Sequence, residues 1–211
     1  MRLCLAVIAL GALMGCGAST SAVGHSGLRG PPDRLPPTEY TEAAADYQHG
    51  CRRGIADACA YLGYMQDNGF GTAKDTAGGV ALCERACSSG SAYGCAYLGY
   101  LHRLGRGVAQ DDERAAQLFR RACDADDLGG CVGLAIMYKS GSGVPRDLDY
   151  AARLFRGACD KGEPLACYSL GYMYANGEGV DVDMDQAARL FRSACDSGDR
   201  VACEAAESVS R

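Results

Sequence analysis

Thirteen cysteines give this 211-residue chain its clearest potential for chemistry. Ten of them form five pairs with seven residues between the two members: Cys51/Cys59, Cys87/Cys95, Cys123/Cys131, Cys159/Cys167 and Cys195/Cys203. So many thiols would suggest metal sites in a reducing cytosol and disulfides in an exported protein. Structural zinc sites favour about two to four residues between paired cysteines. The spacing therefore favours disulfides, and we expect no metal site.

The amino terminus indicates export. Residues 3–14 are an apolar run that is too short to span a bilayer but suits a signal peptide. The run ends in Leu-Met-Gly-Cys at residues 13–16, which resembles a bacterial lipobox. That resemblance implies a signal peptide over residues 1–15 and a lipid on Cys16, although an ordinary signal peptide that contains Cys16 is the alternative. Because Gly17 follows where Asp would signal inner-membrane retention, we expect an outer membrane lipoprotein facing the periplasm or the cell surface.

Residues 16–37 predict a lipidated cysteine followed by a flexible tether. The segment is rich in Gly, Ser and Pro and has no apolar periodicity. A flexible chain of this length spans roughly 25 Å, so the folded part would stand off the membrane with the lipid as its only membrane contact.

Two other motifs could carry chemistry, and each has a structural alternative. Lys139-Ser140-Gly141 matches the K-[ST]-G triplet of penicillin-recognising enzymes, but the chain lacks their S-x-x-K nucleophile motif. Asp181, Asp183 and Asp185 are similar to the start of a calcium loop, yet a glutamine and an arginine stand where that loop needs Gly and Glu. The three histidines form no catalytic arrangement with Ser, Cys or Asp. We therefore expect no catalytic residues and no cofactor.

Arginines at 120, 156 and 192 share one repeat position, which Glu84 interrupts. Arg side chains pair directionally with carboxylates, so these three are candidate contacts for an acidic protein or peptide; a solvated polar face is the alternative. The net charge of −5 gives no support for nucleic-acid binding.

The elements that position these side chains repeat every 36 residues, and a series of residues at this interval is called a column below. Besides the cysteines, columns of Leu, Phe, Gly and Asp recur: Leu82, Leu118, Leu154 and Leu190; Phe119, Phe155 and Phe191; Gly71, Gly107, Gly143 and Gly179; Asp75, Asp111, Asp147 and Asp183. Such a period indicates stacked supersecondary units, none of which can bury its apolar surface alone.

The residue pattern within each 36-residue unit predicts two helices. Asp147 is a suitable N-cap, and residues 151–159 then follow an amphipathic helical pattern. Gly162 ends that helix, and Pro164 suits the first turn of the next, which carries the apolar positions of residues 167–174.

The motif A-x-x-L-F-R-x-A-C-D-x-G, followed by A-C-x-x-L-G-x-M-Y-x-x-G-x-G-V, resembles the Sel-one-like repeat, a relative of the tetratricopeptide repeat, over residues 39–207. The cysteine pairs resemble the disulfide-rich subtype of the Helicobacter cysteine-rich proteins. This resemblance implies an all-α fold over residues 38–211, an α/α solenoid of five hairpins, with each cysteine pair bridging the two helices of one hairpin. Tyr47 and Thr72 depart from the Phe and Val columns in the first unit.

The resemblance also implies function. Solenoids present extended concave surfaces, so we expect a monomeric adaptor that binds a protein or peptide. The alternative is a binder or weak hydrolase of β-lactams or peptidoglycan fragments, an activity linked to the Helicobacter group. Cys83 stands in the Phe column, so we expect a buried apolar thiol.

Replacing Cys16 tests the anchor. Because the lipid would be carried by this thiol, Cys16→Ser should release the protein from membranes or leave an unprocessed precursor. Fractionation and electrophoretic mobility of the two proteins measure this, and a variant that behaves like the wild type would contradict the lipobox interpretation.

Overall fold

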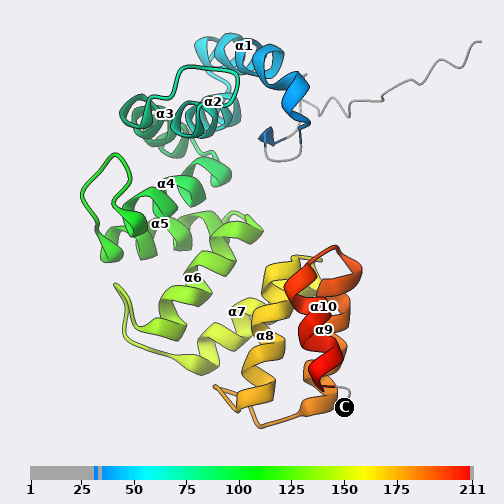
Figure 1. Cartoon of the computed structure of the whole chain (residues 1–211). Helices are drawn as coiled ribbons and strands as arrows, with labels where there is room; N and C mark the ends of the chain where they lie inside the picture. The colour runs from blue at the N-terminus through cyan, green and yellow to red at the C-terminus, as the bar shows by residue number, and fades with distance from the viewer. Residues whose placement is uncertain (1–30, 33–34, 210–211) are drawn as a thin grey trace, which may run out of the picture.

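The computed structural model describes residues 31–32 and 35–209, a range that is helical apart from turns and loops (Figure 1). The predicted signal peptide, Cys16 and most of the predicted tether lie outside the described residues. The elements are η2 Pro37–Glu39, α1 Tyr40–Arg52, α2 Ala56–Asn68, α3 Thr76–Ser88, α4 Ala92–Leu104, α5 Asp112–Asp124, α6 Leu128–Ser140, α7 Leu148–Asp160, α8 Pro164–Asn176, α9 Met184–Asp196 and α10 Arg200–Val209. No helix in this range is long and apolar enough to cross a membrane.

The helices pair into five hairpins, each with a first helix (α1, α3, α5, α7, α9) and a second helix (α2, α4, α6, α8, α10). The Asp column caps four of the first helices: the side chains of Asp75, Asp111, Asp147 and Asp183 accept from the backbone N–H three residues on, at 2.8–2.9 Å. Pro164 opens α8, and Gly162 takes a left-handed conformation in the turn before it. The boundaries predicted for this unit are therefore confirmed.

A disulfide joins the two helices of every hairpin. Sulfur atoms are bonded between Cys51 and Cys59, Cys87 and Cys95, Cys123 and Cys131, Cys159 and Cys167, and Cys195 and Cys203, with Cα atoms 4.5–4.6 Å apart. Each bond links the end of a first helix to the start of the second helix across a turn of only three residues. The predicted α/α solenoid of disulfide-stapled hairpins is confirmed.

Aromatic rings from the first helices pack on glycines of the second helices. Phe119, Phe155 and Phe191 are all buried, with exposed fractions of 1–4%. A Cβ atom built on Gly99 would lie 3.1 Å from the Phe119 ring, and one built on Gly171 would lie 2.8 Å from the Phe191 ring. The absence of a side chain at these glycines lets neighbouring hairpins approach closely.

The loop after each second helix returns to the start of its own first helix. Gly143 has a φ of 67°, and a Cβ atom there would lie 2.1 Å from the carbonyl oxygen of Asp112. Gly71 makes the same approach to Tyr40. Only glycine combines this left-handed φ with so close a backbone contact, which explains the glycine column.

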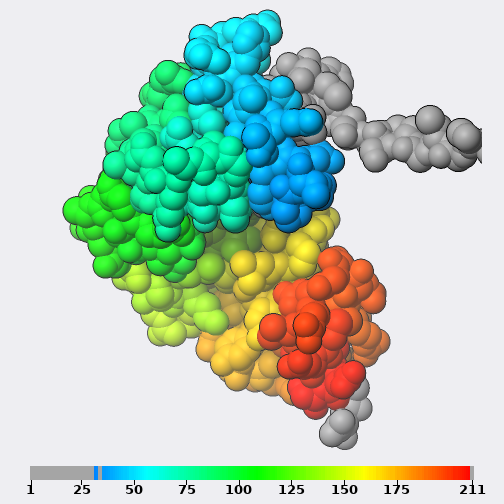
Figure 2. Space-filling view, turned by 45° about the horizontal axis from the view of Figure 1, so that its top comes forward, coloured from blue at the N-terminus to red at the C-terminus, as the bar shows by residue number. Residues whose placement is uncertain are grey.

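The second helices form the inner side of a curved stack. Helix α2 packs against α4, and α4 packs against α6, in addition to the contacts within and between adjacent hairpins. Figure 1 shows the hairpins following one another around a curve, from α1 to α10. In Figure 2 the surface is hollowed between the N-terminal (blue to green) and C-terminal (yellow to red) hairpins.

Two glycine substitutions should have opposite effects on stability. Gly157→Ala in α7 has open space around the new methyl group, so we expect stabilisation by about 0.5–1 kcal/mol from helix propensity. Gly171→Ala in α8 should destabilise, because overpacking against the Phe191 ring costs about 1–3 kcal/mol, which exceeds that gain. Urea unfolding with the disulfides intact measures both changes. Equal stabilisation by the two alanines would contradict the close packing of α8 on Phe191.

Candidate functional site

A groove of about 700 Å³ lies on the inner side of the stack. Side chains from α2, α4 and α6 line it, together with the residues before α6 and the start of α8. We call this the inner groove, and its main lining residues are Pro31, Tyr64, Asn68, Tyr93, Tyr97, Tyr100, Arg103, Arg106, Phe119, Asp126, Asp127, Val132, Gly133, Ile136, Glu163 and Leu165.

One wall of the inner groove is a row of half-buried tyrosines. On α4, the rings of Tyr93 and Tyr97 are stacked with centroids 6.3 Å apart, and those of Tyr97 and Tyr100 are stacked at 5.9 Å. Tyr64 of α2 meets the Tyr97 ring edge to face at 5.1 Å. The wall therefore offers aromatic surface at nearly regular intervals.

A buried carboxylate fixes the central ring of this wall. The Tyr97 hydroxyl donates to Asp67 at 2.6 Å and accepts from the Asn68 amide at 3.0 Å. Asp67 is completely buried and also pairs with Arg106 at 2.9 Å. Burial and the bond to Asp67 raise the pKa of Tyr97, so the phenol stays protonated and the ring keeps its orientation.

The hollow forms because α6 has glycines at the repeat positions where α4 has tyrosines. Gly129 and Gly133 of α6 occupy the columns of Tyr93 and Tyr97. A Cβ atom on Gly133 would lie 2.5 Å from the Phe119 ring, so the glycine leaves that ring as part of the groove lining. The repeat thus loses its regularity at the positions that shape the groove.

Charged residues also line the inner groove. Arg103 and Arg106 lie near the tyrosines, and Asp126, Asp127 and Glu163 lie before α6 and α8. Burial raises the pKa of Asp127, whose side chain caps α6 by accepting from the Gly130 N–H at 2.7 Å. The groove therefore combines apolar surface with charges of both signs.

The arginine column lies apart from the inner groove. Arg120, Arg156 and Arg192 are exposed on α5, α7 and α9 and do not line the groove. Arg120 donates to the hydroxyl of Tyr138 at 2.5 Å, and Arg156 donates to that of Tyr174 at 2.6 Å. These two guanidinium groups thus link the helices of their own hairpins.

The Lys139-Ser140-Gly141 triplet ends α6. Lys139 pairs with Glu178 at 2.9 Å, the Ser140 hydroxyl bonds to Ser142 at 2.9 Å, and Gly141 is the left-handed C-cap. These contacts give the triplet a structural role. Within residues 31–32 and 35–209, no cluster of three or more His, Cys, Asp or Glu residues could hold a metal ion, and Asp183 is engaged as the cap of α9.

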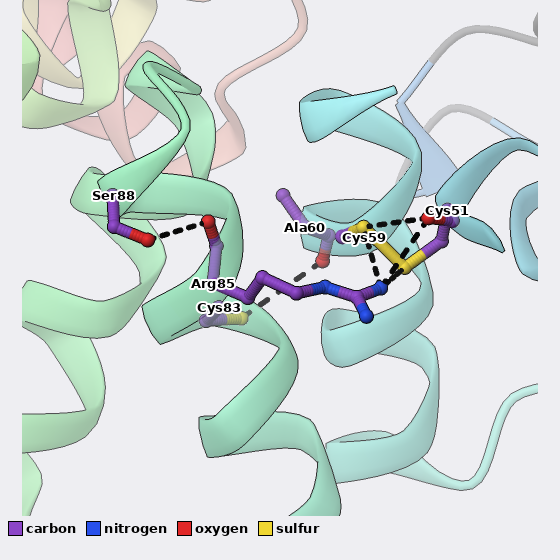
Figure 3. Close-up of a disulfide and its surroundings, with 6 residues drawn as sticks. All are labelled: Cys51, Cys59, Ala60, Cys83, Arg85 and Ser88. Atoms are coloured by element: carbon purple, nitrogen blue, oxygen red, sulfur yellow. Dashed lines mark hydrogen bonds between the residues drawn. A yellow bond between two sulfur atoms is a disulfide. The ribbon is translucent and has the colours of Figure 1, made fainter. Parts of the chain in front are cut away.

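Among the described cysteines, Cys83 alone is outside a disulfide, and it is fully buried in α3 (Figure 3). Its thiol donates weakly to the carbonyl oxygen of Ala60 at 4.0 Å. Burial, with the charges of Asp67 and Glu84, raises the pKa of Cys83 to about 12. Because disulfide exchange requires a thiolate, this neutral thiol leaves the neighbouring Cys51–Cys59 bond intact.

A cation lies against that same disulfide. The Arg85 guanidinium contacts Cys51 Sγ and lies 2.9 Å from Cys59 Sγ (Figure 3). Positive charge stabilises a nearby thiolate, but Cys51 and Cys59 are only 4% and 3% exposed, so an external thiol has little access to this bond.

Sequence reasoning missed the residues of the inner groove. It selected columns that repeat, whereas Tyr93, Tyr97, Asp67 and Arg106 stand at positions that change between repeats. The usable signal was the enrichment of tyrosine on α2 and α4 together with Gly129 and Gly133 on α6.

Comparison with known proteins identifies the repeat. The family model for the Sel1 repeat matches residues 56–91, 92–127, 129–163 and 164–199. Each match begins at or near the start of a second helix, so the family unit combines a second helix with the following first helix, and the disulfides connect successive units. A search of curated proteins finds no match.

Solved structures include similar chains. A protective antigen of uropathogenic Escherichia coli, described as displaying an SLR fold, is 29% identical with a TM-score of 0.67; the match covers 77% of this chain but only 35% of that one. A Sel1 repeat protein from Oxalobacter formigenes is 27% identical with a TM-score of 0.70, covering 79% of this chain and 67% of that one. Cysteine-rich protein B of Helicobacter pylori is 25% identical with a TM-score of 0.49, covering 64% and 96%.

The burial of Cys83 predicts its reactivity. At pH 8 the thiol should remain unlabelled by a maleimide in the folded protein and react fully after denaturation, because burial holds it neutral and out of reach. Peptide-resolved mass spectrometry distinguishes Cys83 from the cysteines of the amino terminus. Rapid labelling of the folded chain would show that this part of α3 is open.

Proposed function

This chain belongs to the Sel1 repeat family, and from that membership together with its inner groove we propose that it is an adaptor that binds a protein or peptide. The observation that carries the proposal is the groove of about 700 Å³ on the inner side of the solenoid. Curved solenoids use such surfaces for binding extended partners. A groove lined by aromatic rings and charged residues has the composition of a peptide site.

The groove is also rigid before a partner binds. Disulfides fix both hairpins that supply the tyrosine wall, Cys51–Cys59 and Cys87–Cys95, and Asp67 holds the central tyrosine. A rigid site loses little conformational entropy when a partner binds. These features support binding rather than turnover, and the Lys139-Ser140-Gly141 triplet gives the hydrolase alternative no additional support because its side chains end a helix.

The arginine column is the second candidate surface. Its three members are exposed and spaced at one residue per hairpin, so acidic residues along an extended partner could pair with them. Arg120 and Arg156 already bond to Tyr138 and Tyr174, which is why we favour the inner groove as the main contact.

We further propose that the protein acts outside the cytoplasm as a lipoprotein of the outer membrane. Five disulfides are typical of an oxidising compartment. The signal-peptide pattern and the lipobox-like ending at Cys16 agree with this location. The tether would place the groove within reach of partners in the periplasm or at the cell surface.

Charge introduced into the groove should abolish binding. Leu165 lines the groove and is 47% exposed, whereas Val182 is 63% exposed outside it. With wild type, Leu165→Asp and Val182→Asp as full chains, we expect cross-linked partners from native membranes to be lost only with Leu165→Asp, because a carboxylate would be desolvated in the complex.

A triple Arg→Ala variant at 120, 156 and 192 completes the experiment, with circular dichroism confirming that all variants fold. If the triple variant loses its partners while Leu165→Asp keeps them, the arginine column is the binding surface and the groove is not.

A further inference from the structure

Resting on the proposed peptide-binding role of the inner groove, we infer that its ligand is an extended, proline-containing segment in the polyproline II conformation. Three observations carry this inference: the spacing of the tyrosine rings, the donors beside them, and the chain's own prolines at the groove.

The ring spacing fits a polyproline II helix. Such a helix rises about 3.1 Å per residue, so two residues advance about 6.2 Å. The centroid distances along α4 are 6.3 Å from Tyr93 to Tyr97 and 5.9 Å from Tyr97 to Tyr100. Successive proline-containing dipeptides can therefore each contact one ring, which is how aromatic-lined grooves recognise such segments.

The fixed orientation of the middle ring strengthens this match. Tyr97 is locked by the Asp67 carboxylate and the Asn68 amide, and its ring is nearly parallel to that of Tyr93, with an interplanar angle of 3°. A rigid ligand gains most from a rigid site, because neither partner loses conformational freedom on binding.

The polar groups of the groove also suit such a ligand. A polyproline II segment has no internal hydrogen bonds, so its carbonyl oxygens are free to accept, and proline supplies no N–H donor. Arg103 and Arg106 line the groove next to the tyrosine row and carry several N–H donors each. Carbonyl oxygens facing these guanidinium groups would be satisfied.

The chain itself places proline at this surface. Pro31 lines the inner groove together with Tyr64 and Tyr93, and Pro32 is among the fully buried side chains. The N-terminal end of the groove thus already accepts a proline from the chain's own pre-helical segment. A partner segment of the same chemistry would extend along the tyrosine row toward α6.

A synthetic ligand tests this directly. The probes are fluorescein-labelled decaproline and a Gly-Ser peptide of equal length, which is flexible and does not favour polyproline II. The proteins are full chains: wild type, Tyr100→Ala, and Tyr172→Ala as the matched control. Tyr172 occupies the same column as Tyr100 and is 45% exposed, but does not line the groove.

Fluorescence anisotropy should show that decaproline binds more tightly than the Gly-Ser peptide. Tyr100→Ala should weaken decaproline binding by about tenfold, the loss typical of an aromatic anchor, whereas Tyr172→Ala should leave it unchanged. A Pro31→Gly/Pro32→Gly variant controls for occupation of the groove by the chain's own prolines.

Two outcomes would overturn the inference. The first is no preference for decaproline in either the wild type or the Pro31→Gly/Pro32→Gly variant. The second is equal loss in Tyr100→Ala and Tyr172→Ala. If either occurs while Leu165→Asp still loses its cross-linked partners, the groove remains a binding site and only the proline specificity is wrong. If Leu165→Asp also keeps its partners, the proposed adaptor function of the groove is wrong as well.

Discussion

The covalent link across each three-residue turn is the constraint on which the rest of the solenoid depends. A disulfide that closes a loop of this length lowers the entropy of the unfolded chain, a stabilisation of about 2–3 kcal/mol in the chain-entropy estimate. Its local effect matters as much, because the bond fixes the end of one helix against the start of the next. With Trp absent and few Phe residues, alanine, leucine and cysteine fill the interior, and the staples compensate for modest burial in each hairpin.

Fixed hairpins make the stacking regular. Glycine columns allow close approach at two places: beneath the aromatic rings of the next first helix, as at Gly99 and Gly171, and where the loop returns to its own hairpin, as at Gly143. The second helices touch across hairpins from α2 to α6, which sets the inner side of the curve. The groove is therefore a consequence of the stacking geometry, and its chemistry is decided by whichever side chains the second helices present there.

The repeating part of this structure could be predicted from sequence because it depends on columns. Asp147 as a cap, Gly162 and Pro164 at the turn, and the apolar stripe of each helix are local signals that recur, and stacking follows from them. Cys83 could be placed in the core for the same reason, because it substitutes for Phe in a buried column. The groove could not be predicted in this way. Tyr93 and Tyr97 stand opposite Gly129 and Gly133 only once the hairpins are stacked, and the pairing of Asp67 with Arg106 joins the end of α2 to the loop after α4.

The difference between repeated columns and positions that change between repeats indicates which residues form the binding site. A residue that recurs from one hairpin to another can be explained by contacts within its own hairpin, as in the bonds from Arg120 to Tyr138 and from Arg156 to Tyr174. A position that breaks the repeat is not required for stacking. Asp67 is such a position: a buried carboxylate is costly unless paired, and its Oδ1 has no hydrogen-bond partner among the described residues. Packing alone gives no reason to keep a charge there, whereas holding Tyr97 and Arg106 at the groove does.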